Sequence, residues 1–183
     1  AQHLKNAMVY NHYNLPSIRP YLWNGWKPCG VKYTYILEID HSMSQLEKDT
    51  KYEILHTDAR MQVGMMSDFA PLYEQTFIRK GFKPPMDGKW LKRFNDIMKP
   101  DIWLAVKENK ILSGVCIMYD FKRAYYIFGA STGEDTSAFC LWNAMQEIQR
   151  PELDMVGCND QKIDCFKRGF GGQLKPYYGV FNV

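Results

Sequence analysis

The residues with the clearest chemical potential lie in one run near the C-terminal end. Residues 164–172 read DCFKRGFGG, in which Lys167 follows Phe166 and three glycines occupy four positions. Glycine permits φ > 0 and a close approach of backbone or ligand. The run is therefore typical either of a ligand-binding turn with a fixed positive charge beside it or of a surface lysine next to a glycine turn.

Other catalytic constellations find little support. The sequence has no His-x-Glu, His-x₃-His or paired-carboxylate spacing, which predicts no catalytic metal. All four histidines precede the strands that would build a cleft: His3, His12, His41 and His56. The five cysteines are widely spaced without a C-x-x-C, so reduced thiols are expected, with Cys116 and Cys140 as small core residues. A cysteine nucleophile is the weaker alternative, since no histidine lies near one in the sequence.

Composition bounds the class of protein. A chain of 183 residues with 46% hydrophobic and 23% charged residues is expected to form one globular domain. A net charge of +3 without a basic block is too small to imply nucleic-acid binding. No apolar run approaches the roughly 20 residues that span a bilayer, and residues 1–10 lack the pattern of a secretory signal. A cytoplasmic protein is expected.

The hydrophobic pattern predicts strands alternating with helices around one central sheet, an α/β (α+β) fold. Residues 1–30 are predicted to be an irregular lead-in with a short strand and turn at 21–26, and residues 31–183 the folded domain. Strands are expected at 32–39, 61–65, 102–106, 111–119, 124–130, 153–156 and 174–183. Helices are expected at 43–57, 87–98, 160–168, from an N-cap at Ser67 to Gly81, and after Gly133 to Pro151.

This order of elements is similar to the acyltransferase fold of the GNAT superfamily. The finer resemblance is to its Fem-type branch, the peptidoglycan aminoacyl transferases and related acetyltransferase-like proteins. Six runs carry it: residues 33–40, 103–106, 113–114, 125–130, 153–157 and 166–172. The resemblance implies a mixed, mostly antiparallel sheet flanked by helices. Because Fem-type enzymes usually carry two such domains, it also implies that this is a second domain, with residues 1–30 as the tail of a first.

The resemblance also implies a catalytic residue. Lys167 matches the lysine that stabilises charge on the carbonyl oxygen as an amine attacks, and Phe166 would hold its ammonium by a cation–π contact. Asp120, which follows Tyr119 at the end of a strand near the expected cleft, is a candidate to orient or deprotonate the amine. A turn-forming role for Asp120 is the alternative.

A cofactor loop is expected where a strand leads into the long helix. In GNAT enzymes this loop cradles the CoA pyrophosphate, and the matching residues are Gly129, Ser131, Thr132 and Gly133. The usual glycine pattern is missing, and Glu134 and Asp135 would repel a pyrophosphate or simply cap the helix. An aminoacyl-tRNA donor, or no donor at all, therefore fits better than acetyl-CoA.

The acceptor residues are predicted less sharply. Tyr119 and Tyr125 are substrate-binding candidates near the cleft, and Tyr125 and Tyr126 should point to opposite faces. Lys51 lies on the helix that meets an anionic acceptor in Fem-type chains, although a solvated helix face explains it better.

Three functions remain open. The first is acyl or aminoacyl transfer to an amine acceptor, such as a small molecule or a bacterial cell-wall (peptidoglycan) precursor. The second is a CoA-dependent N-acetyltransferase with a diverged pyrophosphate loop. The third is a non-catalytic binding module, whose aromatic surface would include Trp23, Trp26 and the last strand, with a homodimer formed through that strand.

Overall fold

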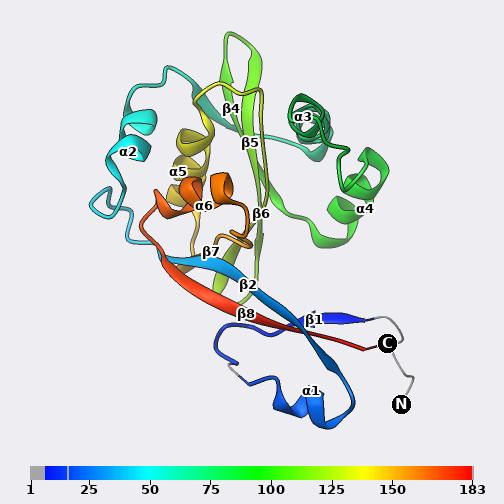
Figure 1. The fold of residues 1–183 in the computed structure, drawn as a ribbon. Helices are drawn as coiled ribbons and strands as arrows, with labels where there is room; N and C mark the ends of the chain where they lie inside the picture. The colour runs from blue at the N-terminus through cyan, green and yellow to red at the C-terminus, as the bar shows by residue number, and fades with distance from the viewer. Residues whose placement is uncertain (1–6, 16, 183) are drawn as a thin grey trace.

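A computed structural model describes residues 7–15 and 17–182, and it shows one mixed sheet (Figure 1). His3 and Val183, which the sequence analysis mentions, lie outside these residues. In the described part of the chain the sheet has eight strands in the order β1-β8-β2-β7-β6-β5-β4-β3. They are β1 (Met8–Tyr10), β2 (Lys27–Glu38), β3 (Arg60–Val63), β4 (Asp101–Lys107), β5 (Lys110–Tyr119), β6 (Arg123–Ser131), β7 (Glu152–Asp154) and β8 (Gln173–Phe181). All neighbouring strands are antiparallel except β6 and β7, which are parallel.

Helices cover the two faces of the sheet unequally (Figure 1). They are α1 (Arg19–Trp23), α2 (Lys48–Leu55), α3 (Met66–Arg79), α4 (Gly88–Met98), α5 (Ser137–Glu147) and α6 (Gln161–Arg168). Because side chains alternate along a strand, Val115 and Ile117 of β5 pack toward α5, while Cys116 between them packs toward α3. Within the described residues, no helix is both long and apolar enough to traverse a lipid bilayer.

Local sequence explains most element boundaries. Glu108 and Asn109 have φ of 49° and 62°, the backbone of a tight hairpin turn between β4 and β5. The Asp87 carboxylate accepts a hydrogen bond from Trp90 N and begins α4, and Asp160 begins α6 in the same way. Cys116 and Cys140 are fully buried, as predicted.

Three local predictions were wrong. Residues 21–26 form the end of α1 and a turn instead of a strand, because Pro20 starts a short helix. The helix predicted at 43–57 begins only at Lys48. Ser67 does not cap α3: Met65 precedes the helix, and the Asp68 carboxylate accepts from Met65 N at 3.0 Å.

The predicted lead-in contributes to the same sheet. β1 pairs with β8 from Met8↔Phe181 to Tyr10↔Gly179, and β2 already begins at Lys27. Residues 11–15 contact β8 and β7, and Asn11 N donates to Tyr178 O at 2.9 Å. Tyr13 there donates to the Glu152 carboxylate at 3.4 Å. The half of the sheet formed by β7, β2 and β8 is polar, and it positions the candidate site.

Candidate active site at the junction of β6 and β7

The parallel strands β6 and β7 pair only briefly and then part. Their register runs from Arg123↔Glu152 to Tyr125↔Asp154, where β7 ends, while β6 continues to Ser131. The pairing of β5 with β6 shifts between Cys116↔Phe128 and Ile117↔Tyr126, which leaves Ile127 as an extra residue on β6. Such a bulge bends a strand locally. Beyond Tyr125, therefore, β6 presents an edge that no described strand pairs.

Buried charges gather at this junction. Of the residues that the structure describes, three charged side chains are buried: Arg123, Asp154 and Lys167, which are 9%, 0% and 5% exposed. Arg123 begins β6, Asp154 ends β7, and Lys167 lies on α6 against the loop that follows β7. Burying a charge costs free energy unless it is paired and hydrogen-bonded. Charges retained in this way mark a functional candidate.

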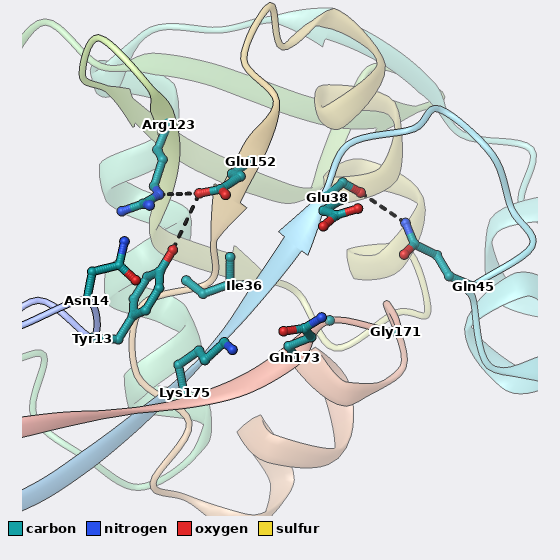
Figure 2. A pocket seen from close by; sticks show the side chains of 11 residues that line it. Tyr13, Asn14, Ile36, Glu38, Gln45, Arg123, Glu152, Gly171, Gln173 and Lys175 are labelled. Carbon is teal, nitrogen blue, oxygen red and sulfur yellow. Dashed lines mark hydrogen bonds and ion pairs between the residues drawn. The ribbon is translucent and has the colours of Figure 1, made fainter. Parts of the chain in front are cut away.

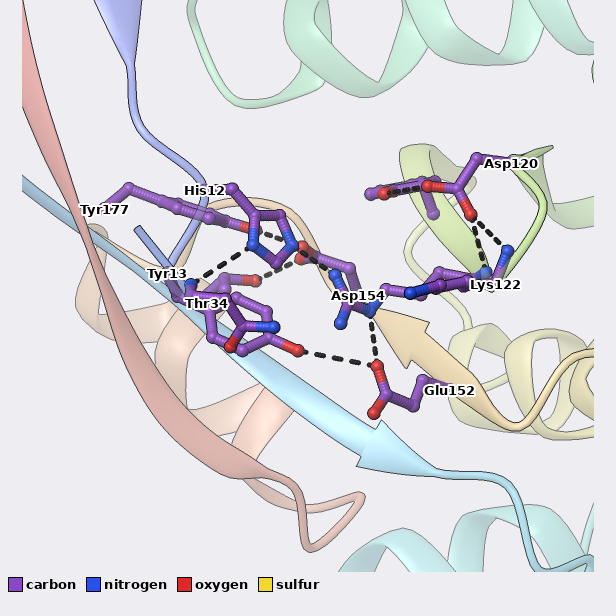
Figure 3. Close-up of polar contacts among 11 residues, drawn as sticks. His12, Tyr13, Thr34, Asp120, Lys122, Glu152, Asp154 and Tyr177 are labelled. Carbon is purple, nitrogen blue, oxygen red and sulfur yellow. Dashed lines mark hydrogen bonds and ion pairs between the residues drawn. The ribbon is translucent and has the colours of Figure 1, made fainter. Parts of the chain in front are cut away.

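Asp154 is held by three donors. Its carboxylate accepts from Thr34 Oγ1 at 2.7 Å, from Val156 N at 2.9 Å and from the Tyr177 hydroxyl (Figure 3). Burial, and then the hydrogen bond to Asp154, raise the pKa of Tyr177 well above its usual value, so Tyr177 remains a donor. The network ties β2, β7 and β8 together beside the point where β6 and β7 part.

Arg123 is the centre of a second group of contacts. Its guanidinium pairs with Glu152, contacts His12 Nε2 and lies 4.9 Å from the centre of the Tyr13 ring. Burial, and next the charge of Arg123, lower the pKa of His12, so the imidazole is neutral near pH 7 and accepts a hydrogen bond from Arg123. Residues far apart in the sequence thus share one polar face (Figure 3).

Lys167 contacts the backbone of residues 155–157, which directly follows Asp154. Its ammonium donates to the carbonyl oxygens of Val156 at 2.7 Å and Gly157 at 2.5 Å, and also to that of Met155. Burial lowers the pKa of Lys167 to about 8, although Cys158 and Asp154 raise it. The ammonium lies 5.4 Å from the centre of the Tyr126 ring. The aromatic partner is thus Tyr126, because neighbours on a helix do not face each other.

Phe166, the expected partner of Lys167, packs elsewhere. Its ring meets Phe170 edge-on with centroids 5.4 Å apart, at the border of the core beneath α5. The glycines that follow serve close packing. A Cβ at Gly171, where φ is 79°, would collide with the carbonyl oxygen of Gln45. The turn between α6 and β8 therefore packs tightly against the loop that precedes α2.

The structure brings Asp120 and Tyr125 together and separates Tyr119 from them. Asp120 accepts from the Tyr125 hydroxyl at 2.7 Å, which lowers the pKa of Asp120, and from Lys122 N and Arg123 N in the turn. Burial raises the pKa of Tyr125 to about 12. Tyr119 packs on the opposite face with Tyr126, as the predicted alternation requires. Lys51 is exposed on α2, which packs against α5.

The predicted cofactor loop is already occupied by the chain itself. Ser131 N donates to Thr76 Oγ1 at 2.9 Å, and Thr132 N donates to Leu112 O at 2.8 Å. Gly133 has φ of 107°, and a Cβ there would crowd the Arg79 guanidinium. Gly129 lies under the Tyr126 hydroxyl. The N–H groups of Ser131 and Thr132 are therefore not free to bind a ligand.

An internal carboxylate caps the start of α5. Glu53 of α2 accepts from Ala138 N at 2.7 Å, inside the first turn. Burial raises the pKa of Glu53, while the hydrogen bond from Ala138 N lowers it. A helix N-terminus is where an anionic phosphate would bind, and here the anion is a side chain. The residues present therefore do not fit the pyrophosphate of CoA.

A polar cavity of about 330 Å³ adjoins the junction on the Asp154 side of the sheet (Figure 2). It is lined by Tyr13, Asn14, Ile36, Glu38, Gln45, Arg123, Glu152, Gly171, Gly172, Gln173 and Lys175. Within the described ranges, no group of three or more His, Cys, Asp or Glu side chains is arranged to hold a metal ion.

Most residues of the polar junction were not predicted from the sequence. Arg123, Asp154, Thr34 and Tyr177 come from four strands, and Glu53 comes from a helix. One signal was available: the polar residues Glu152 and Asp154 flank the apolar Leu153 in a predicted strand. Alternation of this kind indicates that one face of the strands is polar.

Comparison with known proteins identifies the fold. No protein-family model matches the sequence, and no curated protein matches it. Solved structures do match. A GCN5-related N-acetyltransferase from Kribbella flavida has 11% identity and a TM-score of 0.55 over 96% of this chain and 42% of its own. The chain therefore has a GNAT-like acyltransferase fold.

The similarity is greater to two further structures. FemX has 14% identity and a TM-score of 0.68, over 88% of this chain and 67% of its own. The C-terminal domain of a putative lysylphosphatidylglycerol synthetase from Agrobacterium fabrum has 11% identity and a TM-score of 0.69, over 97% and 68%. At these identities the likeness establishes a Fem-type GNAT-like fold, as the sequence predicted.

Proposed function

We propose that the chain transfers an acyl or aminoacyl group to an amine at the junction of β6 and β7. The observation that carries this proposal is the gathering of Arg123, Asp154 and Lys167, the three buried charges of the described chain, where the parallel strands part. Fixed charges in a water-poor site stabilise charge that develops in a transition state. The unpaired edge of β6 offers a place for an extended donor to lie.

The reaction follows from these parts. The amine nitrogen attacks the carbonyl carbon of an activated ester, the carbonyl oxygen becomes negative, and the ester oxygen leaves with a proton that the amine gives up. Lys167 supplies positive charge at the junction and fixes the backbone of residues 155–157. Asp120, a carboxylate held by Tyr125, is the candidate that orients or deprotonates the amine.

The donor that fits best is an aminoacyl ester, such as an aminoacyl-tRNA, and not acetyl-CoA. Glu53 already caps α5, and Glu134 and Asp135 add negative charge to the same loop. A pyrophosphate would have to displace the Glu53 carboxylate from the helix and approach the negative charges of Glu134 and Asp135. Isothermal titration calorimetry with acetyl-CoA tests this point. No heat at millimolar ligand is expected, and saturable binding would restore the CoA-dependent alternative.

One observation favours a non-catalytic binding module as a second candidate. All three N–H groups of the Lys167 ammonium are engaged by main-chain carbonyls, as a structural lysine would be. The two candidates separate in one assay, in which wild-type protein and Lys167→Met are compared for amide formation from a pool of labelled aminoacyl-tRNAs and a peptidoglycan-precursor amine. Transfer that is lost in the variant supports the enzyme, whereas its absence in wild type supports the module.

A further inference from the structure

The polar cavity beside the junction carries two opposite charges that the chain leaves unpaired. Glu38, at the end of β2, and Lys175, on β8, both line it (Figure 2). No described side chain forms an ion pair with either of them. Its other two charged residues, Arg123 and Glu152, pair with each other.

Strand register explains why Glu38 stays unpaired. β2 and β7 place Glu38 directly opposite Glu152, and parallel pairing places Arg123 beside Glu152 on its other side. Like charges directly opposite each other in a sheet are destabilising. Arg123 compensates Glu152, so Glu38 keeps a negative charge that a ligand cation would relieve.

Register also sets the spacing between the two free charges. Lys175 lies opposite Thr34, four residues before Glu38 on β2. At about 3.3 Å per residue, these backbone positions are roughly 13 Å apart along the strand. Ile36 lies between them, with Gln173 opposite it. A single α-amino acid group, with its charges on neighbouring atoms, is too short to meet both.

We infer that this cavity binds a zwitterion whose primary ammonium and carboxylate are separated by a short apolar chain. The ammonium would meet Glu38 and the carboxylate Lys175, with Ile36 beneath the methylenes. The inference rests on the proposed function only where it names this zwitterion as the amine acceptor. Arg123 and Glu152, which line the cavity, are paired two residues before the point where β6 and β7 part, so a bound amine lies beside the strands that form the proposed reaction centre.

Calorimetry on the full chain with 5-aminopentanoate tests the inference, with pentylamine, pentanoate and glycine as probes that lack one charge or the spacing. We expect saturable binding of 5-aminopentanoate and about tenfold to hundredfold weaker binding of the other three, the usual effect of losing a charge-assisted hydrogen bond. Equal binding of all four, or no binding of 5-aminopentanoate, would overturn it.

Two substitutions assign the ends of the ligand. Glu38→Gln should weaken 5-aminopentanoate and pentylamine but not pentanoate, and Lys175→Met should weaken 5-aminopentanoate and pentanoate but not pentylamine. The exposed residues Glu147 and Lys110 supply matched controls, Glu147→Gln and Lys110→Met, which should change nothing. If neither cavity variant differs from its control, the cavity is not the site.

Failure of this inference and failure of the proposed function give different results. Binding that is abolished by Glu38→Gln, without acylation of the bound amine, would leave the site standing and remove the transfer reaction. Transfer to other amines without any binding of 5-aminopentanoate would leave the transfer reaction standing and remove the zwitterion site.

Discussion

Two regions of this fold, the junction of β6 and β7 and the start of α5, handle charge in opposite ways. The junction keeps Arg123, Asp154 and Lys167 buried and faces a cavity with unpaired charges. The start of α5, where the sequence predicted a pyrophosphate-binding loop, is capped by the chain's own Glu53. The difference shows that one scaffold can leave charged side chains unpaired beside a cavity while it satisfies a helix N-terminus with its own carboxylate.

Of the substitutions considered, removing Asp154 from the junction should cause the largest loss of stability. Asp154→Ala leaves the Thr34 hydroxyl, the Tyr177 hydroxyl and Val156 N without their acceptor. Removing one member of a buried charged network typically costs about 3–5 kcal/mol. Chemical denaturation should show a loss of this size, and Asp154→Asn, which keeps an acceptor oxygen, should lose less. Equal stabilities for the wild type and Asp154→Ala would show that the network does not hold the strands.

The pH dependence of stability tests whether the Lys167 ammonium is buried at the junction. Burial lowers its pKa from 10.5 to about 8 in the folded state, so between these pH values the unfolded chain binds more protons. Stability from this group therefore rises with pH across that window, by up to about 3 kcal/mol. Chemical denaturation at pH 7.5 and at pH 10 measures this change. The free energy of unfolding should rise more between the two pH values in the wild type than in Lys167→Met. Parallel pH profiles would contradict the burial of a charged lysine.

A substitution at the start of α5 should cause a smaller loss of stability. Glu53→Ala removes the acceptor for Ala138 N, and losing a helix cap costs about 1 kcal/mol. Glu53→Gln keeps an acceptor oxygen and should lose less, and both can be measured by thermal denaturation. If Glu53→Ala is as stable as the wild type, Glu53 does not cap the helix and the contrast between the two regions fails.

The sequence predicted what depends on local pattern. The hairpin at residues 107–110, the buried Cys116 and Cys140, and the opposite faces of Tyr125 and Tyr126 follow from turn chemistry and from the alternation of strands. The order of elements then led to the correct fold.

What the sequence could not predict depends on register between distant strands. The meeting of Thr34 with Asp154 joins residues 120 positions apart, and Glu53 reaches α5 across 85 positions. The cation–π partner of Lys167 was wrong for the same reason, because Tyr126 comes from another strand. The roles of Lys167, Phe166 and Asp120 in catalysis stay predictions.

The most direct test of the central claim is an amide-formation assay with 5-aminopentanoate as acceptor and a pool of aminoacyl-tRNAs carrying labelled amino acids as donors. The account predicts that wild-type protein transfers label to the amine, that Lys167→Met retains its fold but transfers at least about a hundredfold less, and that acetyl-CoA is not a donor. Equal transfer by the wild type and Lys167→Met, or transfer only from acetyl-CoA, would contradict it.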